Sequence, residues 1–234
     1  MRILGIDTSS HLNGIGLIDD DRILADFSWE AMDNSLQKII LNIDSVLENQ
    51  GFALADVEGL AVGIGPGSWT GVRVGVTVGK VIAYAANKPI CGVSSLDALA
   101  FQARDMSSLL CPLVNAGREN VYAAFHRAQG ETTVQEGEYY VGHIRGLLEM
   151  VQEHTLFLGN AAHLYRQIIA EKLGSLAEFG GEPEDVPRGS VIASLASLRL
   201  RRGESDDALS LSPLYLKEST AQALWAGKKD EKYS

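Results

Sequence analysis

A glycine-rich segment at residues 63–79, GIGPGSWTGVRVGVTVG, is the part of this sequence whose residue types most directly suggest chemistry. Glycine-rich turns that open a helix can hold phosphate groups with their backbone N–H groups. The Walker pattern fails here, because Val74 stands where a glycine must precede Gly79-Lys80. A dinucleotide-binding fingerprint that starts at Gly63 and Gly65 would need a third glycine where Ser68 stands. A nucleophile elbow at Ser68 would need glycines two residues before and after it, and the sequence has Pro66 and Thr70 there.

Two interpretations of this loop stay open. Residues 65–70 suit a tight turn and a helix capped by Ser68 or Thr70, and the free N–H groups at that helix start could also hold an anion. Asp7 is equally ambiguous, because a carboxylate at a strand end can orient a metal ion or a phosphate, or can bond its own turn. The candidate nucleotide contacts are Asp7, Thr8, Ser9, Gly65, Gly67 and Ser68.

Metal-ligand spacing is missing from the sequence. None of the five histidines is four residues from another, and none lies near Cys91 or Cys111, whereas local spacing of such residues is the usual sign of a metal site. No isolated pair of carboxylates has a spacing that signals acid–base catalysis. We predict no metal site, no catalytic residue and two buried, reduced thiols.

Glycines recur every four residues in the helix predicted over 70–86. Gly71, Gly75 and Gly79 therefore share one helix face, and each costs about 1 kcal/mol relative to alanine. Close approach of another backbone offsets such a cost, and the neighbour is either a strand of the same sheet or a helix of another subunit. Because valines such as Val72 and Val76 make the other faces apolar, a subunit interface on this helix stays open beside packing within the domain. If the helix binds a partner, Gly75→Leu is expected to weaken pairing more than folding.

The elements that must position these residues form an α/β pattern. Residues 1–105 read as three strands in a meander, then helix, strand, helix, strand and helix, which predicts a mixed sheet with an antiparallel edge. The first helix has Asn34 as its predicted N-cap and ends before Gly51. The predicted meander strands are Arg2–Ile6, Ile15–Ile18 and Arg22–Trp29, and the apolar positions of the first helix are Leu36, Ile39, Ile40, Ile43 and Leu47.

The second half repeats the beginning of the first. Three further strands are predicted in a meander, followed by helical patches, which indicates a duplicated unit. We therefore predict two domains, 1–105 and 106–234, the second ending in a frayed tail. The predicted strands are Leu109–Asn115, Val121–His126 and Thr132–Tyr140, and the helical patches are Ile144–Glu153, Ala162–Leu173 and Val191–Arg201.

Composition narrows the class of protein. The 234 residues are 46% hydrophobic and carry a net charge of −10, so the chain can bury a core but is poorly suited to grip a nucleic-acid backbone alone. No apolar run reaches the roughly 18 residues that a membrane helix needs. The opening MRILGIDTSS also lacks the features of a secretory signal. We expect a soluble, cytoplasmic protein that does not contact a membrane.

Four stretches resemble the motifs of a known family. They are ILGIDTSS at 3–10, GIGPGSWTGVRVG at 63–75, PICGVSSLDALA at 89–100 and PLYLKEST at 213–220. They occur in the family's order and span nearly the whole chain, and the second is the most specific. On these motifs the chain resembles the TsaB (YeaZ) family of the bacterial pathway that makes threonylcarbamoyladenosine in tRNA.

The resemblance implies the fold shared by actin, Hsp70 and sugar kinases (ASKHA), an α/β architecture of two related domains. It implies a non-catalytic subunit that pairs with a TsaD-type catalytic subunit, is joined by a TsaE-type ATPase, and forms a homodimer when alone. The tRNA would be reached only through the complex. No intrinsic cofactor is implied, and a nucleotide at the interface with the partner stays open.

The resemblance also assigns residues. Ser95 and Leu99 stand where the catalytic family carries metal-binding histidines, and neither side chain ligates a metal as imidazole does. Asn115 and Gly117 depart from the family's Asp-Ala-Arg motif, which leaves any role of that segment open. The helices over 34–49 and 70–86 are the implied partner-binding pair. Their predicted partner-binding residues are Leu36, Ile39, Ile40, Ile43, Leu47, Gly71, Val72, Gly75, Val76 and Gly79.

An enzyme of the same fold is the alternative hypothesis. An ATPase or a small-molecule kinase would use Asp7 and the loop at 65–70 to bind ATP with magnesium. Titration of the isolated protein with that nucleotide separates the two hypotheses, because an accessory subunit is not expected to bind it tightly.

Overall fold

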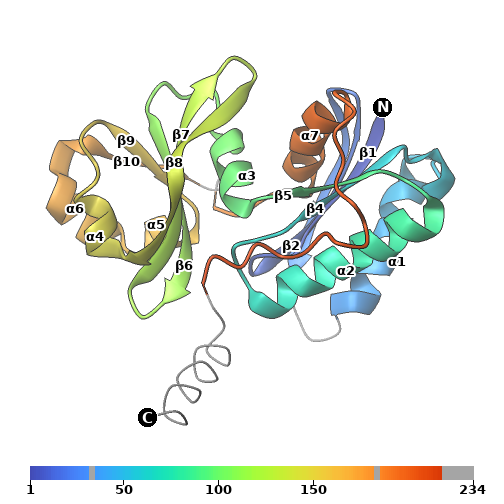
Figure 1. The fold of residues 1–234 in the computed structure, drawn as a ribbon, viewed down its shortest axis with the longest axis horizontal. Helices are drawn as coiled ribbons and strands as arrows, with labels where there is room; N and C mark the ends of the chain where they lie inside the picture. Colours follow the sequence, from blue (N-terminus) through green and yellow to red (C-terminus); the bar gives the residue numbers. More distant parts are fainter. Residues whose placement is uncertain (32–34, 182–184, 218–234) are drawn as a thin grey trace, which may run out of the picture.

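A computed structural model describes residues 1–31, 35–181 and 185–217. Within these ranges the chain forms two α/β units side by side, each built on a five-stranded sheet (Figure 1). Two short 3-10 helices, Leu54–Asp56 and Gly174–Leu176, complete the connections.

The first sheet has the predicted meander at one edge and parallel strands at the other. Its order is β3-β2-β1-β4-β5, with β1 antiparallel to β2 and parallel to β4. The strands β1, β4 and β5 are parallel, so their carboxyl ends lie at the same end of the sheet. Asp7, the loop after Gly63 and the helix start at Ser94 gather there. The strands are β1 (Arg2–Asp7), β2 (Leu12–Asp19), β3 (Arg22–Glu30), β4 (Gly59–Gly63) and β5 (Ile90–Val93).

The second sheet repeats this topology. Read from its meander edge the order is β8-β7-β6-β9-β10, again two antiparallel pairs followed by two parallel pairs. The duplication and the predicted two-unit α/β fold are thereby confirmed, although β10 had no counterpart in the prediction. The strands are β6 (Leu109–Gly117), β7 (Asn120–Gln129), β8 (Thr132–His143), β9 (Thr155–Leu158) and β10 (Ala177–Phe179).

Helices cover both faces of the first sheet. The pair α1 (Ser35–Asn49) and α2 (Trp69–Ala86) lies on one face, and α7 (Gly189–Leu200) lies on the other (Figure 1). The predicted cap of α1, Asn34, lies outside the described residues. The helix α2 ends at Ala86, as predicted, and its C-cap is Asn87 in the left-handed conformation, φ 49°.

The remaining helices belong to the second sheet or to the junction. The helix α3 (Ser95–Gln102) is capped by Ser94 and packs on β6, β7 and β8 as well as on α7. The helices α4 (Ile144–Leu148), α5 (Asn160–Leu164) and α6 (Arg166–Leu173) cover the second sheet, and Cys91 and Cys111 are buried and unpaired, as predicted.

After the second sheet, residues 189–217 pack against the first unit. The apolar face of α7 packs on β1 and β2, because Gly5, Gly16 and Gly189 let the backbones approach closely. Residues 204–217, here called the C-terminal strap, then cross the edge of the first sheet at β5 (Figure 1). The exact division into domains stays a prediction.

Among the described helices, none is both long enough and apolar enough to span a lipid bilayer.

Candidate functional site

A buried polar network lies at the end of β1. Asp7 Oδ1 accepts hydrogen bonds from the backbone N–H of Ser9 at 3.0 Å and from its hydroxyl at 2.8 Å. The Ser95 hydroxyl, at the start of α3, donates to Ser9 Oγ at 2.9 Å. All three residues are buried, so the network joins the first strand to the helix between the two units.

The surroundings of Asp7 disfavour the ionised form of its carboxyl group. Its second carboxyl oxygen, Oδ2, is buried and has no partner among the described residues. Gly63 faces it so closely that an added Cβ would lie 1.9 Å from that oxygen. Burial raises the pKa of Asp7 from 3.8 to about 6, despite the two opposing hydrogen bonds from Ser9.

Asp7→Asn is expected to remove a pH dependence of stability. Because the folded-state pKa is raised, folding takes up a proton, and this stabilisation is complete below pH 3.8 and lost as the pH rises through about 6. The difference between the two pKa values corresponds to about 3 kcal/mol. Urea unfolding of both proteins across this window should show the wild type losing stability relative to the variant. Parallel pH profiles would contradict the raised pKa.

The glycine-rich loop after β4 is a tight turn against β1. Ser68 donates its backbone N–H to the Ser9 carbonyl at 2.7 Å and accepts from Gly71 through its side chain at 3.2 Å, so it is the N-cap of α2. Gly65 has φ 88°, and a Cβ on Gly67 would lie 2.1 Å from the Ser9 carbonyl oxygen. Both glycines are therefore explained by the fold.

The structure thus brings the predicted nucleotide contacts together, and it buries Asp7, Thr8 and Ser9, whereas Ser68 stays exposed. The C-terminal strap lies over the loop, with the Leu214 N–H donating to the Ile64 carbonyl at 2.8 Å and Tyr215 packing on Trp69 at 4.5 Å between ring centroids. The cavity left between loop and strap has about 50 Å³, whereas ligand sites measure roughly 300–1,000 Å³. Nucleotide binding at these residues stays a prediction, and it would require the strap to move.

The interpretation of the glycine stripe as a face for another chain is wrong. A Cβ on Gly71 would lie 2.0 Å from the Thr8 carbonyl oxygen, one on Gly75 2.3 Å from Thr8 Oγ1, and one on Gly79 2.1 Å from a methyl group of Val62. Thr8 also donates to the Gly71 carbonyl at 2.7 Å. The neighbour that requires these glycines is the chain's own sheet, at β1 and β4.

Most of the predicted partner-binding side chains are likewise part of the protein's own core. The amphipathic faces of α1 and α2 pack onto the first sheet, so these residues do not form its outer surface. Ile40 is the exception at 42% exposure, and the side chain of Leu36 lies outside the described residues. The buried members are Ile39, Ile43, Leu47, Val72, Gly75, Val76 and Gly79.

The opposite side of the two helices carries an exposed, largely apolar strip. On α2 its residues follow a four-residue spacing, and Arg73 lies 5.6 Å from the Trp69 ring centroid in a cation–π contact. A hollow of about 330 Å³ runs along the first two turns. This helix-pair surface consists of Ile40, Leu41, Trp69, Arg73, Thr77, Val81 and Tyr84.

Sequence reasoning missed this surface, apart from Ile40, although a signal was present. If the glycine face of α2 is turned inward, residues two positions further along point outward. Arg73 follows Gly71 by two, Thr77 follows Gly75, and Val81 follows Gly79. Val81 is 61% exposed, and with the exposed Trp69 and Tyr84 of the same helix it forms an apolar patch of the kind typical of an interaction surface.

Ser95 and Leu99 are both buried on α3. Ser95 belongs to the Asp7 network, and Leu99 packs in an apolar cluster with Val114 and Ala124 of the second sheet. In the described parts of the chain, no three residues of the His, Cys, Asp or Glu type gather as a metal site would require.

Comparison with known families gives matches along most of the chain. The model of the family described as TsaD, tRNA N6-adenosine threonylcarbamoyltransferase, matches residues 29–225. The "tRNA threonylcarbamoyladenosine biosynthesis protein TsaB" of Bacillus subtilis is 33% identical over 228 residues, which cover 96% of this chain and 98% of that protein. The protein of the same name from Escherichia coli is 32% identical over 140 residues, 59% of this chain and 60% of its own.

Solved structures agree on the fold. YeaZ from Pseudomonas aeruginosa superposes with a TM-score of 0.79 at 24% identity, covering 92% of this chain and 99% of its own. ROK hexokinase from Thermus thermophilus superposes with a TM-score of 0.50 at 12% identity, covering 87% of this chain and 100% of its own. The likeness to a sugar kinase supports the two-unit ASKHA architecture.

Proposed function

Because this chain belongs to the TsaB family, we propose that it acts in threonylcarbamoylation of the adenosine next to the tRNA anticodon, as an accessory subunit of the catalytic protein. The observation that carries the proposal is the match to a TsaB protein over 96% of the chain. The helix-pair surface gives the proposal a physical basis, since it exposes apolar side chains that the chain leaves uncovered.

The partner on this surface is a TsaD-type catalytic subunit. Its helices would pack on α1 and α2 and bury Leu41, Val81 and Tyr84, which are 59%, 61% and 68% exposed. A TsaE-type ATPase joins the pair, and in the absence of both partners the same surface forms a homodimer. The net charge of −10 is consistent with tRNA being bound only through the complex. These associations place the protein in the cytoplasm.

The chain contributes no chemical step under this proposal. Ser95 and Leu99 provide no imidazole where the catalytic family has histidines, and the Asp7 network is buried. No intrinsic cofactor is required. A nucleotide held at the interface would be bound jointly with the partner, at the exposed side of the loop formed by residues 65–70.

Reconstitution tests the proposal directly. Cognate TsaD-type and TsaE-type proteins, the adenylate-forming enzyme and tRNA are combined with and without this chain, and threonylcarbamoyladenosine is quantified in the tRNA. The expected result is product only when the chain is present.

Equal product without the chain would overturn the accessory role. Calorimetric titration of the isolated chain with ATP and magnesium then tests the alternative, an ATP-binding enzyme of the same fold that uses Asp7 and the loop. Tight binding would favour that alternative.

A further inference from the structure

A cleft is lined by residues of α3, α7, β5 and the β7–β8 hairpin. Its volume is about 450 Å³. This volume falls in the range of sites that hold small ligands. None of its lining residues belongs to the helix-pair surface or to the Asp7 network, so it needs an explanation of its own.

One wall of this cleft, here called the hairpin cleft, presents a carboxylate in a fixed position. Asp97 on α3 is 40% exposed at its side chain, and its Oδ1 lies 3.0 Å from Nε2 of His126 on β7. His126 is buried, and its other ring nitrogen has no partner among the described residues. An ionised carboxylate only accepts hydrogen bonds, so Nε2 donates to it and holds Asp97 toward the cleft.

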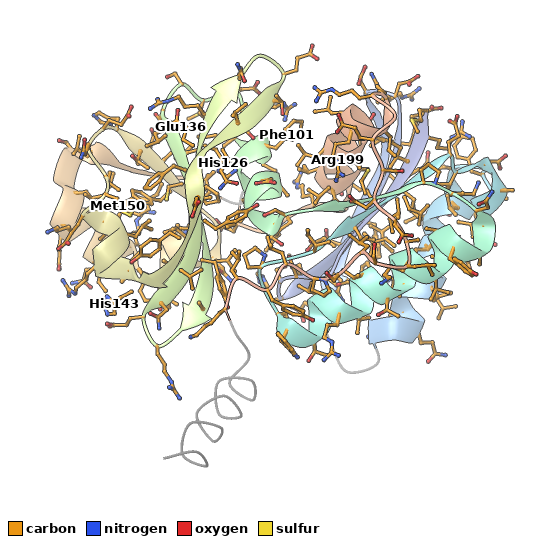
Figure 2. All side chains as sticks on the ribbon, viewed as in Figure 1. Phe101, His126, Glu136, His143, Met150 and Arg199 are labelled. Atoms are coloured by element: carbon orange, nitrogen blue, oxygen red, sulfur yellow. The ribbon has the colours of Figure 1, made fainter. Side chains whose placement is uncertain are left out.

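The wall formed by α7 presents two guanidinium groups, of which one is already neutralised. Arg199 binds Asp206 of the strap through two hydrogen bonds of 2.8 and 3.1 Å and also donates to the Gly92 carbonyl (Figure 2). Arg202, three residues further on, is exposed, and its side chain forms no hydrogen bond or ion pair within the described part of the chain. One guanidinium group without an ion-pair partner therefore lines the same cleft as Asp97.

Apolar side chains form part of the remaining lining, beside the polar side chains of the hairpin, which are Gln129, Thr132 and Thr133. Leu195 and Leu198 on α7 are partly exposed, and Val134 on the hairpin is 44% exposed. Apolar surface combined with a few polar groups is typical of small-molecule sites.

We propose that the hairpin cleft binds a small zwitterion with an apolar body, namely an amino acid with an apolar side chain or a short peptide. The ammonium group would pair with Asp97, the carboxylate with Arg202, and the apolar body would pack on Leu195, Leu198 and Val134. A simple anion would be repelled by Asp97 and a simple cation by Arg202, whereas a zwitterion satisfies both charges. This site is separate from the proposed function and does not depend on it.

Calorimetric titration of the full chain tests the proposal with L-leucine, L-phenylalanine and the dipeptide leucyl-alanine as probes. Saturable binding of at least one probe is expected. For leucine, leucinamide lacks the carboxylate and 4-methylpentanoate lacks the ammonium group. Each should bind at least about tenfold more weakly, because each loses one charge-assisted hydrogen bond.

Three single-residue variants test whether the probes bind in the hairpin cleft. Arg202→Ala and Asp97→Asn should each weaken it at least about tenfold. Asp97→Asn keeps an oxygen for the His126 hydrogen bond, so the fold should be unchanged by circular dichroism. Arg201→Ala is the matched control, because Arg201 pairs with Asp21 at 2.8 Å instead of lining the cleft. No saturable binding of any probe, or equal binding by all three variants, would overturn the proposal.

Discussion

Gly75→Leu is expected to lower the free energy of unfolding by about 3 kcal/mol or more. Leucine gains about 0.8 kcal/mol of helix propensity over glycine, but its Cβ would lie 2.3 Å from Thr8 Oγ1. Thr8 is 1% exposed and its hydroxyl is fixed on the Gly71 carbonyl, so it cannot turn aside without losing that bond. The other atoms of the leucine would also have to fit between α2 and the sheet, which is a case of severe overpacking.

Thr77→Leu provides the matched control for this prediction. It places the same side chain on the same helix, two residues further along and on the exposed side, where the change should be within about 0.5 kcal/mol. Urea unfolding followed by circular dichroism measures both variants. A Gly75→Leu protein of unchanged stability that fails to bind its partner would instead restore the idea that the glycines face another chain.

Leu41→Glu combined with Val81→Glu is expected to abolish pairing with the TsaD-type subunit while the chain stays folded. Both side chains are more than half exposed, so the free protein tolerates a charge at either position. In a complex, each glutamate would be buried in an apolar interface without a counter-charge. We expect affinity to fall roughly hundredfold or more, and threonylcarbamoyladenosine formation in the reconstituted system to fall with it.

The control for this pair is Leu164→Glu. Leu164 lies on α5 of the second unit and is 58% exposed, which is close to the exposure of Leu41. Its replacement should leave affinity and product formation unchanged. If it impairs pairing as strongly as the double variant does, the interface lies on the second unit and the helix-pair surface is the wrong assignment.

The meanders and helices were predictable because they depend on local patterns. Strand alternation, turn residues such as those at 19–21, and caps such as Ser68 and Ser94 act within a few residues. β10, with the three residues Ala177–Phe179, is too short to show such a pattern. The duplicated order of strands could be inferred because both halves repeat the same sequence of elements.

Local patterns could not predict which face of a helix packs on the sheet and which face is exposed. A glycine stripe shows that something approaches closely, but its identity depends on tertiary packing, here that of Thr8 and Val62. The return of α7 to the first sheet involves partners almost the whole chain apart, and no local pattern encodes it. The pairing of Asp97 with His126 joins two units for the same reason.

The C-terminal strap and α7 have a consequence for synthesis on the ribosome. One face of the first sheet is covered by α7, and the contacts that fix this arrangement join residues far apart in sequence, such as Arg201 and Asp21, which are 180 residues apart. The strands β1 and β2 leave the ribosome first, yet they keep an apolar face open until residue 200 has emerged. Nascent chains with exposed strands and long-range closure fold late and are prone to aggregate. The first unit begins to be translated before the second, yet its packing is completed only after the second unit has been translated.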